Sequence, residues 1–247
     1  MAISPTALIT GANKGIGFEV ARQLGQRGFT VWLGCRDEGR GNQAGSALLA
    51  EGIQARLLLL DVEKSDDILA AARRFGEQNE RLDVLVNNAG MHFGPPPAAY
   101  EEPLEQVEAI FRVNVFGVLR VTQAFVPYLK QSHAGRIVMM TSGLGSIGET
   151  MNPQSENWPV GFAGYSASKT ALNMFTVKLA KELESFGIKV NAADPGLTAT
   201  DLTGQAGSRT PKDAARVAVE LATLDSAGPN AGFFKFDHPA GLVAHPW

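Results

Sequence analysis

The sequence predicts a single-domain α/β fold in which a seven-stranded parallel sheet is doubly wound, with helices on both faces. Short apolar runs alternate with segments of helical periodicity along the whole chain. A glycine-rich turn follows the first apolar run, and a chain of 247 residues that is 45% hydrophobic can bury one large core. Parallel strands need crossover connections of about a dozen residues or more, which the intervening helices provide.

The expected strands are short apolar runs. They cover residues 7–10, 31–35, 55–60, 84–86, 136–140, 188–193 and 232–236. The expected helices lie between them, where apolar residues recur at spacings of three and four. They begin after Gly17 and near Ala44, and then cover residues 68–75, 107–129, 163–186 and 211–224. The unbroken alternation indicates one domain over residues 1–247.

Two segments break this alternation. Residues 143–162 contain Pro153 and Pro159 and show no clear periodicity, and residues 199–210 are polar and contain glycine. Both segments follow the ends of expected strands, and open α/β sheets bind ligands beyond the carboxyl ends of their strands. We therefore expect them to form walls or lids of a substrate site. Surface insertions without a role in binding are the alternative.

Charge and composition exclude several classes of partner. The formal net charge is −3 and no run of Lys or Arg stands out, so nucleic acids and anionic membrane surfaces are not expected partners. The N-terminus has no basic region followed by a long apolar run, and no later segment is apolar for long enough to span a membrane. These features predict a soluble, cytoplasmic protein with a small-molecule partner, either a monomer or a homo-oligomer.

A disulfide or a metal site is not expected either. Cys35 is the single cysteine and lies in an apolar run, which is typical of a small buried hydrophobic side chain. The four histidines show no spacing typical of metal ligands. His92 and His133 are interpreted as solvated side chains.

The glycine-rich turn is the first candidate binding site. Gly11, Gly15 and Gly17 are spaced as G-x-x-x-G-x-G between the first expected strand and the first expected helix. Glycines at this place let the backbone approach a pyrophosphate, and the N-terminus of a helix attracts its charge. The turn, which also contains Asn13, Lys14 and Ile16, predicts a dinucleotide cofactor on a Rossmann-type fold.

The end of the second expected strand predicts which dinucleotide binds. An acidic residue there suits the ribose hydroxyls of NAD, whereas this strand ends in Cys35-Arg36-Asp37. A guanidinium at Arg36 suits the 2′-phosphate of NADP(H), and Lys14 and Arg40 add positive charge nearby. NADP(H) is therefore the expected cofactor. Asp37 argues against it unless this residue caps the following helix.

A tyrosine and a lysine supply the first candidate for proton transfer. Tyr165 and Lys169 lie four residues apart in an expected helix and therefore share one face. A nearby ammonium group favours the phenolate over the phenol, which would bring the tyrosine pKa closer to neutrality. The pair predicts a proton donor. An ordinary helix start is the alternative that these five residues alone leave open.

Taken together, these residues resemble the markers of the short-chain dehydrogenase/reductase family. The markers in chain order are Thr10 to Gly17, Asn87 to Gly90, Asn114, Ser142, Tyr165 with Lys169, and Pro195-Gly196. The resemblance spans nearly the whole chain. Within that family, the glycine loop with Asn13-Lys14, the Cys35-Arg36-Asp37 sequence and the Ser142-Gly-Leu-Gly145 sequence look most like the NADPH-dependent carbonyl reductases.

The resemblance implies a role for each of four candidate catalytic residues. Tyr165 would donate a proton to the carbonyl oxygen as hydride arrives from the nicotinamide, and Ser142 would hold that oxygen. Lys169 would lower the tyrosine pKa and bind the nicotinamide ribose. Asn114 would keep a water near Lys169 for proton relay, or alternatively form a local bond to the backbone.

The resemblance also implies further cofactor contacts. Asn88, Ala89 and Gly90 would line the adenosine side, and Asp61 and Val62 would meet the adenine. The expected nicotinamide contacts are Pro195, Gly196, Thr198 and Thr200. Asp61 could instead cap the next helix, and either threonine could cap a turn.

The segment between Ser142 and Tyr165 departs from the family pattern, because it is longer than the usual interval. Met151, Trp158, Val160 and Phe162 give this segment apolar surface. A bulky hydrophobic substrate that contacts Gly143, Trp158 and Phe162 is the hypothesis that follows. Anchoring of the loop to the body of the protein is the alternative.

The expected function is therefore NADPH-dependent reduction of a ketone or aldehyde to an alcohol. A dehydrogenase or reductase of a sugar, steroid or hydroxyacyl substrate is a second possibility. A non-catalytic NADP-sensing protein is a third, although such proteins usually lose the tyrosine or the lysine, and both are present here.

Overall fold

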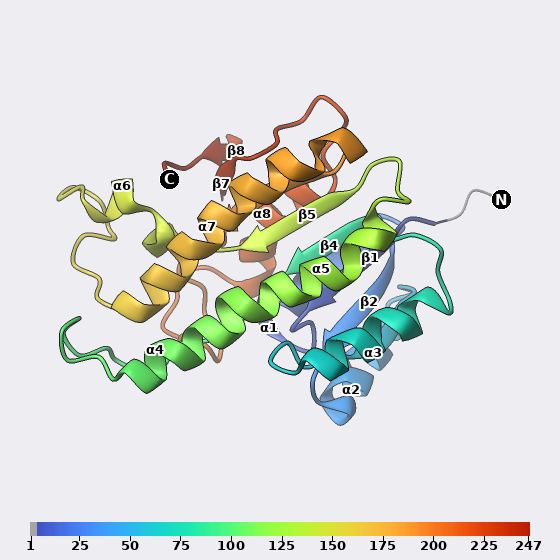
Figure 1. Cartoon of the computed structure of the whole chain (residues 1–247), viewed down its shortest axis with the longest axis horizontal. Coiled ribbons are helices and arrows are strands. Elements are labelled where there is room, and N and C mark those ends of the chain that lie inside the picture. Colours follow the sequence, from blue (N-terminus) through green and yellow to red (C-terminus); the bar gives the residue numbers. More distant parts are fainter. Residues whose placement is uncertain (1–3) are drawn as a thin grey trace.

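The protein is built around one twisted sheet, seen in a computed structural model that describes residues 4–247. Within these residues, eight strands form a sheet of order β3-β2-β1-β4-β5-β6-β7-β8 (Figure 1). Their bounds are β1 Thr6–Thr10, β2 Thr30–Cys35, β3 Ala55–Leu59, β4 Val84–Asn87, β5 Arg136–Met140, β6 Lys189–Asp194, β7 Phe233–Asp237 and β8 Gly241–Ala244. The pairs from β3 to β7 are parallel, and β8 is antiparallel to β7.

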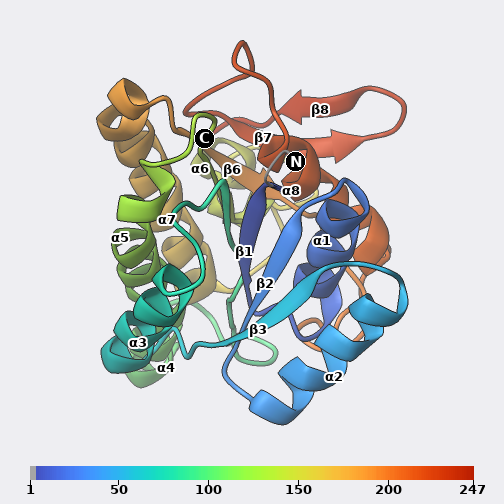
Figure 2. The same cartoon turned by 90° about the vertical axis from the view of Figure 1, so that its right-hand side faces the viewer.

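Helices cover both faces of the sheet (Figure 2). Their bounds are α1 Gly15–Gln26, α2 Glu38–Ala50, α3 Ser65–Gly76, α4 Leu104–Phe111, α5 Val118–Leu129, α6 Ile147–Thr150, α7 Ala163–Leu183 and α8 Pro211–Ala222. Side chains of a strand alternate between the two faces, so Ile9 packs in one core with α1, α2 and α8, whereas Leu8 packs in the other with α3, α5 and α7. The doubly wound Rossmann-type arrangement predicted from the sequence is confirmed.

The prediction of seven strands is wrong by one. β8 was not predicted, because Gly241-Leu-Val-Ala244 is short and follows a turn that contains Pro239. The hairpin pairs β8 with β7, as in the register Phe234–Ala244 and Asp237–Gly241. The other elements match the expected ones to within a few residues at their ends.

The long helix predicted over residues 107–129 differs in two ways. It begins at Leu104, and residues Arg112–Gly117 form a π-helical segment between α4 and α5. The helix from Leu104 to Leu129 is long and apolar enough to span a membrane, but half of its apolar window is buried in the molecule. Val121, Phe125 and Leu129 pack in the core beneath it, which accounts for the composition.

The irregular segments occupy the positions that we expected. Residues 199–210 form no helix or strand, whereas residues 143–162 contain a 3₁₀ turn at Gly143–Gly145 and the short helix α6. The two segments follow the carboxyl ends of β5 and β6, and β4, β5 and β6 are consecutive strands in the centre of the sheet. The parallel register places the ends of these three strands at one edge, where the candidate site residues meet.

Candidate active site

The glycine loop forms a cradle for a pyrophosphate between β1 and α1. Gly11 and Gly15 adopt left-handed backbone conformations, with φ of 66° and 59°, which glycine adopts without strain. A Cβ atom at Gly17 would lie 2.5 Å from Asn88 Nδ2 and 2.6 Å from Gly11 O, so only glycine fits there. In the described part of the chain, no side chain caps the N-terminus of α1, which leaves its N–H groups available to an anion.

A cavity of about 680 Å³ extends from this cradle along the carboxyl edge of the sheet. The predicted cofactor residues that line it are Gly11, Asn13, Lys14, Gly15, Ile16, Arg36, Asp61, Val62, Ala89, Gly90 and Thr200. The sequence interpretation missed further lining residues, among them Met91 and Val113, and Asp201, Leu202 and Gln205 in the loop after β6. For Asp201, Leu202 and Gln205, the only indication in the sequence was that they lie in the predicted lid segment, residues 199–210. The size, the glycine cradle and the polar rim fit a dinucleotide.

The end of β2 places the side chain of Arg36 in the lining of this cavity. Asp37 accepts a hydrogen bond from Arg40 N at 2.8 Å and so caps the N-terminus of α2. Arg40 Nε lies 3.8 Å from the same carboxylate, and Arg40 does not line the cavity. Arg36 is exposed and lines it. In the sequence, Asp37 argued for NAD over NADP(H). That argument no longer holds, because the Asp37 carboxylate caps α2.

Lys14 connects the glycine loop to the loop after β6. Its ammonium forms an ion pair with Asp201 at 2.5 Å, and both side chains are more than half exposed. The hydrogen bond and charge of Lys14 hold the pKa of Asp201 below its ordinary value. Because Asp201 partly neutralises Lys14, the positive charge that we expected beside the cofactor phosphate falls mainly to Arg36.

The four candidate catalytic side chains meet beside Gly90. Lys169 Nζ donates to Met140 O at 2.8 Å, at the end of β5, and lies 5.5 Å from the centre of the Tyr165 ring. Ser142 Oγ accepts from Leu144 N at 3.2 Å, and the Ser142 hydroxyl is near enough to Tyr165 to lower the pKa of its phenol. A Cβ atom built on Gly90 would lie 3.6 Å from Lys169 Nζ and 3.4 Å from Asn114 Oδ1. Tertiary folding therefore brings these residues together as the resemblance implied.

Asn114 is held by neighbouring elements on two sides. Its Oδ1 accepts from Met91 N at 2.8 Å, and its Nδ2 donates to Met91 O at 2.9 Å and to Ser168 Oγ at 3.1 Å. Ser168 Oγ in turn donates to Tyr165 O at 2.6 Å. Asn114 lies in the π-helical segment, a distortion that frequently marks functional sites in helices. The side chain thus joins the loop after β4 to the turn of α7 that carries Tyr165.

Burial controls the ionisation of the Tyr165–Lys169 pair. Burial raises the pKa of the Tyr165 phenol far above its ordinary value, the Asp194 carboxylate raises it further, and the hydrogen bond with Ser142 lowers it. Burial lowers the pKa of Lys169 to about 8. Burial therefore outweighs the lowering of the tyrosine pKa that we expected from Lys169, and Ser142 is the neighbour that opposes it.

Three loops surround this centre. Two of them are the expected segments, residues 143–162 and 199–210. The third, residues 91–103 after β4, was not predicted. Gly161 lies against Pro96, where a built Cβ would be 3.1 Å from Pro96 Cγ. His92 packs edge to face against Tyr165 and Phe162, with ring centres 5.6 and 5.1 Å apart. The interpretation of His92 as a merely solvated residue is wrong, because it lies half-buried beside the candidate proton donor.

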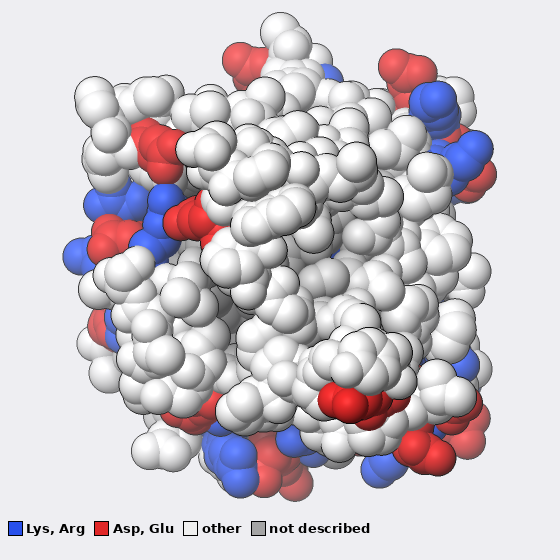
Figure 3. Space-filling view, turned by 90° about the vertical axis from the view of Figure 1, so that its left-hand side faces the viewer, with Lys and Arg blue, Asp and Glu red and all other residues white. Residues whose placement is uncertain are grey.

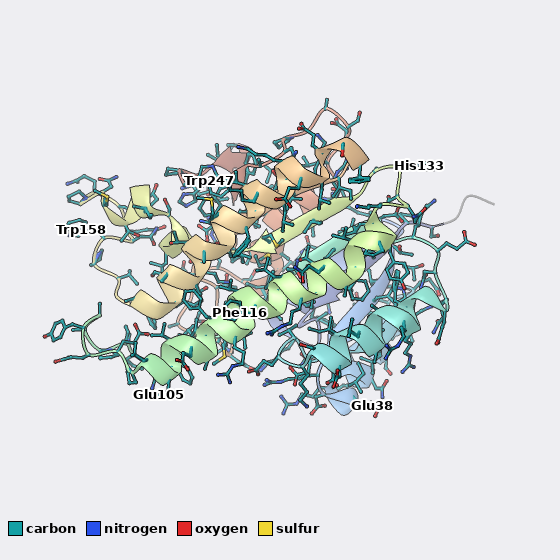
Figure 4. The ribbon with its side chains drawn as sticks, in the orientation of Figure 1. Glu38, Glu105, Phe116, His133, Trp158 and Trp247 are labelled. Carbon is teal, nitrogen blue, oxygen red and sulfur yellow. The ribbon has the colours of Figure 1, made fainter. Side chains whose placement is uncertain are left out.

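The face formed by these loops carries few charges. Figure 3 shows a hollowed surface with most Lys, Arg, Asp and Glu side chains around its margin. Exposed apolar side chains in the three loops are Phe93, Tyr100, Ile147, Met151, Trp158, Val160 and Leu202, and Leu197 lies just before residues 199–210. Trp158 lies at the outer end of the molecule on the loop after α6 (Figure 4), and its exposed fraction is 52%. Phe162, a predicted substrate residue, packs on the same His92 ring as Tyr165.

Several predicted residues support the site from behind instead of lining the cavity. Asn88 Nδ2 donates to Thr10 O at 2.9 Å and braces the glycine loop. Thr198 is buried and its Oγ1 donates to Gly196 O at 3.0 Å, so it stabilises the turn after Pro195. Gly143 is buried against Asp194. Within residues 4–247, no group of three or more histidine, cysteine, aspartate or glutamate side chains is arranged to hold a metal ion.

Comparison with known families agrees with this geometry. A model of the short chain dehydrogenase family matches residues 5–211, which include the glycine loop, Asn114, Ser142, Tyr165 and Lys169. The chain belongs to the short-chain dehydrogenase family. It is therefore an oxidoreductase that uses a nicotinamide cofactor, and the resemblance inferred from the sequence is confirmed.

Individual relatives cover nearly the whole chain of this short-chain dehydrogenase. The short-chain dehydrogenase anuI of Penicillium roqueforti (strain FM164) is 36% identical over 98% of both chains. The (−)-isopiperitenone reductase of Mentha piperita is 33% identical over 96% of this chain and 98% of its own. A short-chain dehydrogenase of Escherichia coli CFT073, crystallised with NADPH, superposes with a TM-score of 0.82 at 29% identity over 94% of this chain and 95% of its own.

Proposed function

We propose that this protein is an NADPH-dependent carbonyl reductase that converts a ketone or aldehyde to an alcohol. The observation that carries the proposal is the grouping of Ser142, Tyr165, Lys169 and Asn114. Ser142 lowers the pKa of Tyr165, Lys169 Nζ lies 5.5 Å from the centre of the Tyr165 ring, and Asn114 donates to Ser168 in the turn that carries Tyr165. NADPH supplies a hydride, which carries two electrons to the carbonyl carbon. Tyr165 supplies the proton to the oxygen, so the product is the alcohol with a new C–H and a new O–H bond.

Each polar side chain has a distinct task in this reaction. The Ser142 hydroxyl donates to the carbonyl oxygen as negative charge develops on it, and the dry site strengthens that bond. Lys169, which is buried and bonded to Met140 O, binds the cofactor ribose and takes part in resupplying the proton to Tyr165. Asn114 holds the loop after β4 and the Tyr165 turn in register.

The preference for NADPH depends on Arg36. Its guanidinium lies at the cavity mouth, and the neighbouring carboxylate of Asp37 caps α2. A guanidinium binds the 2′-phosphate through charge-assisted hydrogen bonds, each of which contributes about 1.5–3 kcal/mol. The relative from Escherichia coli was crystallised with NADPH, which supports the same choice.

The substrate is an apolar carbonyl compound of moderate size, which binds between the three loops. The apolar side chains around the site and the scarcity of charges on that face (Figure 3) support this class over sugars and phosphorylated substrates. One relative is by name a reductase of isopiperitenone. We further propose that the chain works as a single catalytic domain in the cytoplasm, on small molecules and not on nucleic acids or membranes.

A panel of small and bulky ketones and aldehydes, assayed with NADPH and with NADH, tests the proposal. The wild-type protein should oxidise NADPH with apolar ketones and give a chiral alcohol. Arg36→Ala should lower kcat/KM for NADPH by about 10-fold to 100-fold and leave that for NADH nearly unchanged. Arg40→Ala is the matched control, because Arg40 does not line the cavity. A wild-type preference for NADH that Arg36→Ala leaves unaltered would contradict the cofactor assignment.

A further inference from the structure

A buried carboxylate and a buried imidazole lie next to the candidate catalytic serine. Asp194 is the last residue of β6 and is 7% exposed, and His245 follows β8, with 5% of its side chain exposed. His245 Nε2 lies 3.3 Å from Asp194 Oδ2. Neither residue belongs to the cofactor cavity or to the four candidate catalytic residues.

The Asp194 carboxylate joins three loops. Its Oδ1 accepts from Gly196 N at 2.9 Å, and the N–H of Gly143, the residue that follows Ser142, helps to lower the pKa of the carboxyl. A Cβ atom at Gly143 would lie 3.1 Å from Asp194 Oδ2 and 3.3 Å from His245 Nε2, so the backbone of this turn lies directly against the pair. The orientation of Ser142 therefore depends on the carboxylate.

His245 is positioned by the hairpin that the sequence did not predict. Its backbone N–H donates to Phe233 O at 2.7 Å, and its ring stacks on the Phe233 ring with centres 4.6 Å apart. Glu149 of α6 faces the other ring nitrogen, with Oε1 4.0 Å from Nδ1. Trp247 stacks on the same phenylalanine, and its carbonyl oxygen accepts from Gly148 N at 3.2 Å. The end of the chain thus closes over the loop that carries Ser142.

We propose that Asp194 and His245 form a positioning pair that holds the Ser142–Gly143 turn in place and offsets the carboxylate charge beside Tyr165. The charged and titratable groups around the pair are Glu149 from α6, Tyr165 from α7 and Lys235 from β7. Lys235 is opposite Asp194 in the strand register, but its Nζ lies 3.8 Å from Asp237 Oδ2, and β7 also contributes the Phe233 ring. Without His245, a buried carboxylate would keep only backbone donors, and the turn would be free to shift. The effect on turnover rests on the proposed carbonyl reduction.

The electrostatic environment agrees with this geometry. Burial alone would raise the pKa of Asp194, but the hydrogen bond from His245, the N–H groups of Gly196 and Gly143 and the charge of His245 lower it below its ordinary value. The Asp194 charge in turn raises the pKa of Tyr165. A phenol with a higher pKa keeps its proton to higher pH, so changes to the pair should move the alkaline limb of the kcat profile.

Four variants test the pair. His245→Phe keeps a ring on Phe233 but removes the donor, His245→Gln retains a donor, and Asp194→Asn removes the charge. The double variant Asp194→Asn/His245→Phe removes both. His133→Phe is the control, because His133 is an exposed histidine in the turn before β5 (Figure 4).

We expect His245→Phe to lower kcat by about 10-fold to 100-fold, since a shift of about 1 Å in a reacting group can cost that much. The KM for NADPH should stay near the wild-type value, and the alkaline limb of kcat should move to higher pH. The double variant should recover part of the lost kcat, and the alkaline limb of its kcat profile should fall at a lower pH than in the wild type. His245→Gln should fall between His245→Phe and the wild type.

A second readout does not require turnover. Amide hydrogen exchange at residues 143–146 in the protein without cofactor should be faster in His245→Phe and unchanged in His133→Phe. Wild-type exchange together with a wild-type kcat profile in His245→Phe would overturn the proposal, as would a double variant no better than His245→Phe. If the wild-type protein reduced no carbonyl, the proposed function would fail, whereas the exchange comparison would still decide whether the pair positions the turn.

Discussion

Tyr165 presents the central problem at the scale of single residues, because it is partly buried and desolvation raises the pKa of its phenol. A phenol that holds its proton firmly at neutral pH is a suitable donor only when the acceptor develops strong negative charge. Hydride transfer to a carbonyl carbon creates such an acceptor, and the hydrogen bond from Ser142 shares the charge. The residue therefore suits reduction, with the proton leaving only as the alkoxide forms.

Tyr165→Phe should lower kcat for ketone reduction by about 100-fold or more, because the reaction loses its proton donor while the ring packing on His92 is kept. The dissociation constant for NADPH should change little. Steady-state kinetics and fluorescence titration measure the two quantities. Tyr100→Phe is the matched control, since Tyr100 is 88% exposed. A loss of NADPH binding in Tyr165→Phe as large as the loss of kcat would contradict the assigned role.

Burial of the Lys169 ammonium lowers the stability of the folded protein. Burial lowers its pKa to about 8 from the ordinary value of 10.5, so the charged form is disfavoured in the folded protein. Between these two values the unfolded chain binds more protons than the folded protein, and stability therefore rises as pH increases through this window.

Lys169→Met should consequently stabilise the protein near pH 7 by up to about 3 kcal/mol, less the lost hydrogen bond to Met140 O, while it abolishes turnover. The advantage of the variant should disappear by about pH 10.5, where the unfolded lysine is also neutral. Urea unfolding at pH 7, 9 and 10.5 measures this difference. A stability difference that is the same at all three pH values would contradict the pKa shift as its cause.

At the scale of elements, α7 starts under strain immediately before Tyr165. Phe162 at its N-terminus is left-handed, with φ of 63°, an uncommon conformation for a residue other than glycine. Glu102, from the loop after β4, accepts a hydrogen bond from Gly164 N at 2.8 Å and so caps the helix from another part of the chain. The position of Tyr165 thus depends on a loop that is distant in sequence.

Glu102→Ala should lower the free energy of unfolding by about 1 kcal/mol, the usual loss for an N-terminal cap, and should also lower kcat. Thermal denaturation and ketone kinetics measure the two effects. Glu101→Ala, at the exposed neighbouring position, should leave both quantities near the wild type. Equal effects of the two substitutions would show that the cap is not the cause.

The loop before α7 should determine which carbonyl compounds bind. Phe162→Ala removes a ring that packs on His92 beside Tyr165, and it should change the ratio of kcat/KM values for bulky and small ketones. Trp158→Ala should change that ratio less, because Trp158 lies further out and is half exposed. The same substrate panel measures both. Equal changes for all substrates would indicate that Phe162 only anchors the loop.

At the scale of the whole molecule, the cofactor cavity lies across the centre of the sheet and contacts loops after β1, β2, β3, β4 and β6. A ligand that bridges so many loops stabilises the folded state by mass action. NADPH at about 100 times its dissociation constant should add about 2.7 kcal/mol to the free energy of unfolding. Differential scanning fluorimetry should show a larger rise in Tm with NADPH than with equal NADH, and Arg36→Ala should remove the difference.

The fold and much of the cofactor site were predictable from local patterns. Short apolar runs indicated the parallel strands, apolar residues at helical spacing indicated the helices, and the spacing of Gly11, Gly15 and Gly17 indicated the cradle. These features depend on neighbours within one or two turns of the chain, so the sequence alone predicts them. β8 could not be predicted from local patterns, because its four residues are stabilised by pairing with β7. The π-helical segment at Asn114 could not be predicted either, because it retains ordinary helical periodicity.

The sequence by itself indicated proton and hydride transfer, through the residue types Ser142, Tyr165 and Lys169 and their order along the chain. Tertiary structure decided how those groups behave. It buried the phenol and the ammonium, committed Asp37 to the α2 cap, placed His92 beside Tyr165 and brought His245 to Asp194. Burial, charge and hydrogen bonding between groups far apart in sequence depend on the packed geometry, because desolvation and Coulomb interactions follow distance in space.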